Sequence, residues 1–270
     1  MISSQVTSGD EQAVAPGPAR ASVVAGVAAA WGVGLALFLG GSVPLLDTIL
    51  LVLLLVVMPG FALVQASMLE GMEFDRLSAY WSSIATLWVL GATAWLVGAR
   101  DGGIAAIGIV GMPFFDFVLW SFGLGATGVG VMLLFRLVGL WRGVSETAVL
   151  GRLLPRNRKE KRVFVLLSLV AGFGEEIAYR GYAIPMLAVA VGLPWSVVLT
   201  SVVFGALHAY QGRLGMVRTA VMGAILAGGF LGAGSLLPVI VAHALVDIVG
   251  GLVIGDWFVE DSRRNNEAVG

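Results

Sequence analysis

The chain has 270 residues, of which 58% are hydrophobic and 12% are charged, and its mean hydropathy is +0.94. Soluble domains carry about 25% charged residues, so this composition excludes a soluble enzyme and indicates a polytopic membrane protein. The absence of cysteine excludes a disulfide scaffold and thiolate chemistry. A formal net charge of −1 argues against nucleic-acid partners.

The elements expected along the chain begin with a polar, proline-containing tail at residues 1–20, which we expect to be disordered and cytoplasmic. Eight stretches are then long and apolar enough to cross a bilayer as helices. They are residues 21–41, 43–69, 79–98, 113–135, 163–191, 194–211, 215–234 and 236–255. We therefore predict an all-α fold, a membrane helix bundle of about eight transmembrane helices over residues 21–256, and a cytoplasmic tail at 257–270. Residues 104–112 lead into Pro113 and are compatible with a re-entrant or interfacial piece.

The loop charges predict the orientation of the bundle. Segment 152–162, RLLPRNRKEKR, contains six basic residues and is expected to stay in the cytoplasm. Four predicted helices lie on either side of it, so both termini are expected to be cytoplasmic. The other loop arginines fall on the same side, with Arg100 as the exception. Short loops and no extra domain are typical of a multi-pass protein of the bacterial inner membrane.

The 38 glycines have a structural explanation. Small residues spaced four apart let helices approach closely in lipid. Such pairs include Gly26 with Ala30, Gly205 with Ala209, and Gly228 with Gly232. We expect these pairs to mark helix contacts.

Three of the last four stretches contain polar residues that a membrane helix rarely carries. They are Glu175, Glu176 and Arg180 in 163–191, His208 in 194–211, and His243 and Asp247 in 236–255, and the two histidines are the only ones in the chain. A charged side chain at the bilayer centre costs at least about 2.5–3.5 kcal/mol, so these groups are expected to meet. Glu176 and Arg180 are spaced i,i+4, as are His243 and Asp247, and each pair therefore shares a helix face. A rise of about 1.5 Å per residue puts four of them, Glu175, His208, His243 and Asp247, in one layer about 10 Å thick, in the middle-to-cytoplasmic half of the bilayer.

The chemistry of such a cluster follows from its carboxylates. Two adjacent carboxylates in a low dielectric do not both ionise freely. If Arg180 holds Glu176 charged, Glu175 is left as a proton acceptor and a candidate general base toward water. Imidazoles and carboxylates together also suit either a divalent metal such as zinc or the stabilisation of an oxyanion, and the sequence leaves both open. The candidate metal ligands are Glu175, His208, His243 and Asp247.

The three motifs together resemble a known family. EExxxR at Glu175, FxxxH ending at His208 and HxxxN/D at His243, in that order on successive membrane helices, resemble the CAAX prenyl endopeptidase and bacteriocin-processing (CPBP) family of intramembrane proteases. The resemblance covers roughly residues 163–254. It implies an endopeptidase that hydrolyses a peptide bond of a membrane-associated peptide or membrane protein, such as a leader-bearing peptide or bacteriocin. Signatures of other proteases, HExxH and GxSxG, are absent.

The resemblance also implies roles for the site residues. Glu175 and His208 would activate the attacking water, and Arg180 would hold the glutamate pair through Glu176. His243 and Asp247 would stabilise the oxyanion or help to hold a metal. Many members of the family have Asn where this chain has Asp247, and an ionised aspartate would repel an oxyanion.

Two other functions are compatible with the same residues. A non-catalytic membrane scaffold or bacteriocin-immunity protein of this fold would use the charged residues to lock helices together. A proton- or cation-coupled transporter would use them as a relay, although the chain lacks a convincing internal repeat.

Overall fold

The structure, a computed structural model, describes residues 18–69, 71–144 and 146–255, and these residues form helices and no strands. The first half contains α1 (Pro18–Leu39), α2 (Leu45–Val52), η1 (Leu53–Val57), α3 (Met58–Leu69), α4 (Arg76–Gly98), α5 (Gly103–Ala106), α6 (Phe114–Arg142) and α7 (Ala148–Leu153). The second half contains α8 (Arg158–Glu176), η2 (Ile177–Ala183), α9 (Ile184–Val191), α10 (Leu193–Leu207), η3 (Ala209–Gln211), α11 (Gly212–Ala233), α12 (Leu237–Val249) and η4 (Gly250–Ile254). The predicted all-α fold is confirmed.

Each of the eight predicted stretches coincides with a helix or with consecutive helical segments. Within the described residues, five helical runs are long and apolar enough to cross a membrane. They are Leu45–Leu69, Arg76–Gly98, Phe114–Arg142, Ala209–Ala233 and Leu237–Ile254. The chain is thus a multi-pass membrane protein, and a total of eight crossings stays a prediction.

Some boundaries differ from those expected. Helix α1 already begins at Pro18, inside the predicted tail 1–20, and the predicted tail 257–270 lies outside the described residues. Helix α6 begins directly after Pro113, and the only helix in 104–112 is the end of the short α5. This piece therefore lies outside the crossing helix.

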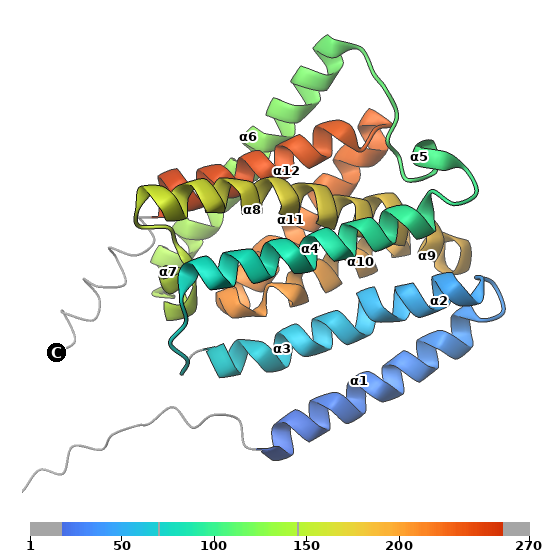
Figure 1. Ribbon diagram of the computed structural model, residues 1–270, viewed down its shortest axis with the longest axis horizontal. Coiled ribbons are helices and arrows are strands. Elements are labelled where there is room, and N and C mark those ends of the chain that lie inside the picture. Colours follow the sequence, from blue (N-terminus) through green and yellow to red (C-terminus); the bar gives the residue numbers. More distant parts are fainter. Residues whose placement is uncertain (1–17, 70, 145, 256–270) are drawn as a thin grey trace, which may run out of the picture.

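Helix α8 lies between α4 and α12, and the three run side by side (Figure 1). The contact with α4 is made backbone to backbone: a Cβ added at Gly174 would lie 2.4 Å from the Leu87 carbonyl oxygen, and one added at Gly91 would lie 2.6 Å from Gly174 Cα. On the opposite side, a Cβ at Gly172 would lie 2.7 Å from the Ile240 carbonyl oxygen of α12. Glycine at these positions therefore fixes the place of the α8 end, where the two glutamates lie.

The small-residue pairs expected from the sequence have a mixed outcome. A Cβ at Gly205 would lie 2.5 Å from the Met216 carbonyl oxygen, which confirms a close approach of α10 and α11. Nothing lies within 4 Å of a Cβ added at Gly26 or Gly228, so at these two positions the expected contact is wrong, whereas a Cβ added at Gly232 would lie 2.9 Å from the Trp120 ring. Spacing alone does not tell which face of a helix meets a neighbour.

A buried carboxylate in the first half of the chain pairs with an arginine and is joined to η2 by a tyrosine hydroxyl. Asp47 of α2 is fully buried, and its carboxylate accepts hydrogen bonds from Arg100 Nη1 and Nη2 at 2.8 and 2.6 Å. The Tyr182 hydroxyl of η2 donates to the same carboxylate at 3.0 Å. A bidentate arginine and a phenol together compensate the cost of burying this charge.

Candidate active site

The two glutamates lie where the α-helix gives way to a wider π-helix. Helix α8 ends at Glu176, and η2 continues the same rod as a π-helical segment from Ile177 to Ala183. Segments of this kind often occur at functional sites because they turn side chains away from the regular helical faces. The segment carries Arg180, which is 2% exposed.

Glu176 is the centre of the buried network. Its Oε1 accepts a hydrogen bond from Arg180 Nη1 at 2.8 Å, and it also accepts one from His243 Nδ1 at 2.6 Å. The side chain of Glu176 is completely buried. Removing either donor would leave a buried charge less well compensated and would destabilise the fold. Glu176 thus connects α8, η2 and α12.

Arg180 reaches two further helices. Its Nη2 donates to the Gly223 carbonyl oxygen of α11 at 3.1 Å, and its guanidinium carbon lies 4.3 Å from the centre of the Phe204 ring of α10. This is a cation–π contact in a buried place, where such contacts are strongest. Arg180 thereby holds Glu176 and orients Phe204 at the same time.

The second ring nitrogen of His243 faces the other two carboxylates. Nδ1 of His243 donates a hydrogen bond to Glu176. Nε2 of the same ring lies 3.8 Å from Glu175 Oε2 and 3.7 Å from Asp247 Oδ2. Both distances exceed a hydrogen bond but are within the range of ion pairs. The structure thus brings Glu175, Glu176, Arg180, His243 and Asp247 together, as the helical spacing predicts.

His208 joins the cluster through an aromatic ring. It follows the last residue of α10, and its Nδ1 donates to the Phe204 carbonyl oxygen at 2.8 Å, which leaves Nε2 of the neutral ring as an acceptor. The Phe204 ring centre lies 5.1 Å from that of His208 and 5.9 Å from that of His243. The sequence placed His208 inside a crossing helix over 194–211, whereas α10 ends one residue before it.

The side chains of the cluster differ in solvent exposure. The side chains of Glu176 and His243 are 0% and 8% exposed, whereas those of Glu175 and Asp247 are 14% and 38% exposed. Oε2 of Glu175 is itself buried and has no hydrogen-bond partner among the described residues, and the same holds for Oε2 of Glu176. Glu176 is completely buried and accepts two hydrogen bonds through Oε1, whereas the Glu175 side chain is partly exposed.

A metal site does not emerge from these side chains. Within residues 18–69, 71–144 and 146–255, no group of three or more His, Asp or Glu side chains is arranged to hold a metal ion. Nδ1 of His243 is bonded to Glu176, and Nδ1 of His208 is bonded to a backbone carbonyl. A histidine that ligates a metal through Nε2 usually has its Nδ1 hydrogen bonded in this way, so these bonds do not exclude a metal, and zinc stays an untested prediction.

Some residues of the site were not singled out by the sequence. Phe204 and Tyr179 are typical packing residues, yet Phe204 contacts Arg180 and both histidine rings. Gly223 offers a carbonyl, which no side-chain pattern reveals. The FxxxH spacing was the available signal for Phe204, since it puts this ring one helical turn before His208.

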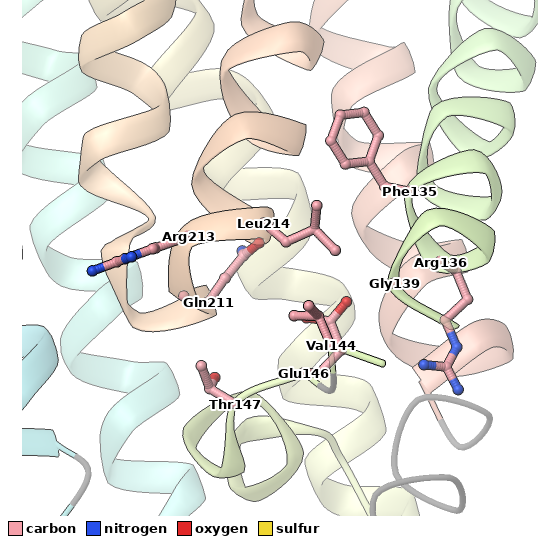
Figure 2. Close-up of a pocket in the computed structure, with 10 residues that line it drawn as sticks. Phe135, Arg136, Gly139, Val144, Glu146, Thr147, Gln211, Arg213 and Leu214 are labelled. Atoms are coloured by element: carbon pink, nitrogen blue, oxygen red, sulfur yellow. The ribbon is translucent and has the colours of Figure 1, made fainter. Parts of the chain in front are cut away.

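A cavity of about 230 Å³ opens beyond His208, between α6, the segment before α7, and the start of α11. Figure 2 shows the side chains of Glu146, Thr147 and Gln211 gathered around it. Its remaining lining residues are Phe135, Arg136, Gly139, Val144, Gly212, Arg213 and Leu214. Gln211 follows His208 by three residues, so the cavity and the polar cluster share the η3 turn.

Comparison with known proteins bears on the same region. The model of the family described as type II CAAX prenyl endopeptidase Rce1-like matches residues 159–249. No curated protein and no solved structure matches the chain. The matched segment contains all six candidate residues and confirms the resemblance drawn from the three motifs. In this segment, about a third of its length, the chain is similar to the Rce1-like type II CAAX prenyl endopeptidases of the CPBP family.

Proposed function

We propose that this protein is an intramembrane endopeptidase that hydrolyses a peptide bond with water activated by Glu175 and His208. Its substrate is a membrane-associated peptide or a membrane protein, and the site lies in the cytoplasmic half of the bilayer. The observation that carries the proposal is the division between the glutamates. Glu176 is completely buried and accepts hydrogen bonds from Arg180 and His243, whereas the Glu175 side chain is 14% exposed and its Oε2 lies 3.8 Å from His243 Nε2 without a hydrogen bond among the described residues.

The reaction runs through a tetrahedral intermediate. The Glu175 carboxylate takes a proton from water while the water oxygen adds to the carbonyl carbon, and the electrons of the C=O bond move to its oxygen. Collapse of the intermediate breaks the C–N bond, and the proton held by Glu175 passes to the leaving nitrogen. His208 assists through Nε2, which is the unprotonated nitrogen of its neutral ring. The products are a new carboxyl terminus and a new amine.

His243 and Asp247 act on the carbonyl oxygen in this scheme. The hydrogen bond from His243 Nδ1 to Glu176 fixes the ring, so that the Nε2 edge faces the space between Glu175 and Asp247. A protonated Asp247 or an imidazolium at His243 donates to the oxyanion as it forms. Fixed donors in a low dielectric are the strongest source of such stabilisation.

A purely structural network would not need Glu175. The Glu176–Arg180 pair and His243 already join α8, η2 and α12 without it. Glu175 is therefore better explained by a peptidase than by a scaffold or immunity protein.

The test is to compare the membrane peptides of cells that carry the wild-type chain, Glu175→Gln or the control Glu73→Gln. Glu73 is exposed and lies in the loop before α4, so its substitution leaves the site intact. We expect a longer precursor to accumulate with Glu175→Gln alone. If the wild type and Glu175→Gln yield the same peptides while both chains are present in equal amounts, the proposal is wrong.

A further inference from the structure

A series of hydrogen bonds leads from the cavity to Tyr210, whose ring lies beside that of His208. Arg218 of α11 donates to Glu146 Oε1 through Nη1 at 2.7 Å and to Gln211 Oε1 through Nη2 at 2.9 Å. Gln211 Nε2 in turn donates to the hydroxyl oxygen of Tyr210 at 3.1 Å. Arg218 is buried, and Glu146 and Gln211 line the cavity (Figure 2).

The donor and acceptor roles in this series of hydrogen bonds are fixed. A guanidinium has only donors, so the side-chain carbonyl of Gln211 must face Arg218, and Thr219 Oγ1 donates to the same oxygen at 3.4 Å. The amide nitrogen of Gln211 therefore faces Tyr210, and the phenol oxygen acts as the acceptor. The hydrogen of the phenol must point elsewhere, and no described residue accepts it.

Tyr210 lies at the border of the candidate active site. Its ring centre is 6.0 Å from that of His208, whose own ring contacts Phe204 beside His243. The backbone around it is held as well, because Thr147 Oγ1 donates to the Tyr210 carbonyl oxygen at 2.7 Å. The hydroxyl group is thus held by Gln211, and the backbone of Tyr210 is held by Thr147.

We propose that Tyr210 is a further catalytic residue, whose hydroxyl donates a hydrogen bond to the carbonyl oxygen of the scissile peptide bond. The inference rests on the proposed function and adds a donor for the oxyanion. A phenol is protonated at neutral pH, so Tyr210 can act as a donor. Gln211 is a positioning residue, since it occupies the acceptor side of the hydroxyl and leaves only the donor free.

The first test does not depend on turnover. The full-length chain, with 3-fluorotyrosine at position 210 and in detergent micelles, is compared by ¹⁹F NMR with its Glu175→Gln, Asp247→Asn and Asp101→Asn variants. We expect the fluorine resonance to move in the first two variants and to stay in place with Asp101→Asn, because Asp101 is exposed and pairs with Arg100. A fluorine chemical shift that is the same in the wild type, Glu175→Gln and Asp247→Asn overturns the placement of Tyr210 beside the site.

The second test measures cleavage of the precursor peptide that accumulates with Glu175→Gln, labelled with a fluorophore and a quencher. Tyr210→Phe keeps the ring and removes only the hydroxyl. We expect kcat to fall about 100-fold, the usual effect of losing one oxyanion donor, with KM within about twofold. The control Tyr80→Phe removes a hydroxyl that donates to the Leu153 carbonyl oxygen, and it should leave kcat unchanged.

The outcomes separate the two proposals. An unchanged kcat in Tyr210→Phe, together with an inactive Glu175→Gln, overturns the role of Tyr210 and leaves the endopeptidase in place. A Glu175→Gln variant as active as the wild type overturns the endopeptidase mechanism and the catalytic role of Tyr210 with it. A fall of kcat in Gln211→Leu that is smaller than that in Tyr210→Phe supports the positioning role.

Discussion

His243 Nδ1 donates to Glu176 Oε1 across 2.6 Å, and this one hydrogen bond joins α12 to the end of α8. The two residues are separated by 67 positions in the sequence. Through this bond the rotation of the imidazole ring depends on a carboxylate that Arg180 also holds. The network around Glu176 therefore determines both the stability of the bundle and the direction of His243 Nε2.

Breaking one partner of the buried pair should destabilise the fold. Arg180→Met leaves the Glu176 charge buried, and we expect a loss of about 3–5 kcal/mol in the free energy of unfolding. Thermal unfolding in detergent micelles measures this change. The double variant Glu176→Leu with Arg180→Met removes both charges and should be more stable than Arg180→Met alone. A double variant that is less stable would contradict this account of the pair.

The glycine contact beside the glutamates gives a second prediction. Gly174→Ala places a Cβ against the Leu87 carbonyl oxygen, which is backbone and cannot rotate away, so α4 must shift. We expect a loss of about 1–3 kcal/mol in thermal unfolding experiments. Gly228→Ala is the matched control, because open space surrounds its added Cβ. Equal stability of the two variants would show that the α4–α8 contact is looser than described.

Asp247 should tolerate the change to asparagine. The amide of Asp247→Asn can donate a hydrogen bond to an oxyanion, so we expect cleavage within a fewfold of the wild-type rate. Asp247→Leu removes the polar group, and kcat should fall about 100-fold. Initial rates of precursor cleavage provide the measurement. An inactive Asp247→Asn variant would mean that the carboxylate itself is required.

Chelation should leave the reaction unaffected. The proposed mechanism activates water with Glu175 and His208 and uses no metal ion. We therefore expect precursor cleavage in liposomes to continue after dialysis against EDTA, with no metal in stoichiometric amount by elemental analysis. Loss of cleavage that Zn²⁺ restores would replace this mechanism with a metal-dependent one.

Part of the site could be predicted from sequence because helical spacing fixes local geometry. Glu176 and Arg180, which are spaced i,i+4, form an ion pair with Arg180 Nη1 2.8 Å from Glu176 Oε1. The relation between His243 and Asp247 became a separation of 3.7 Å. The high cost of charge in a membrane also predicted that these groups would meet across helices.

Other features depend on contacts that no spacing encodes. Arg180 lies in the π-helical segment that follows Glu176, and from there it contacts α10 and α11. Helix α10 ends just before His208, where the short η3 turn begins. The direction of Gln211 is fixed by Arg218, which lies seven residues further along the chain. Tyr210 therefore became a candidate only when these helices were placed side by side.

The rate of cleavage by Glu175→Gln tests the central claim most directly. The purified chain in liposomes is mixed with the precursor peptide, and the wild type, Glu175→Gln and the control Glu73→Gln are compared. The account predicts that Glu73→Gln cleaves like the wild type and that Glu175→Gln is slower by a factor of at least about 100, the loss expected for a general base. A Glu175→Gln variant that is folded and cleaves at the wild-type rate would contradict it.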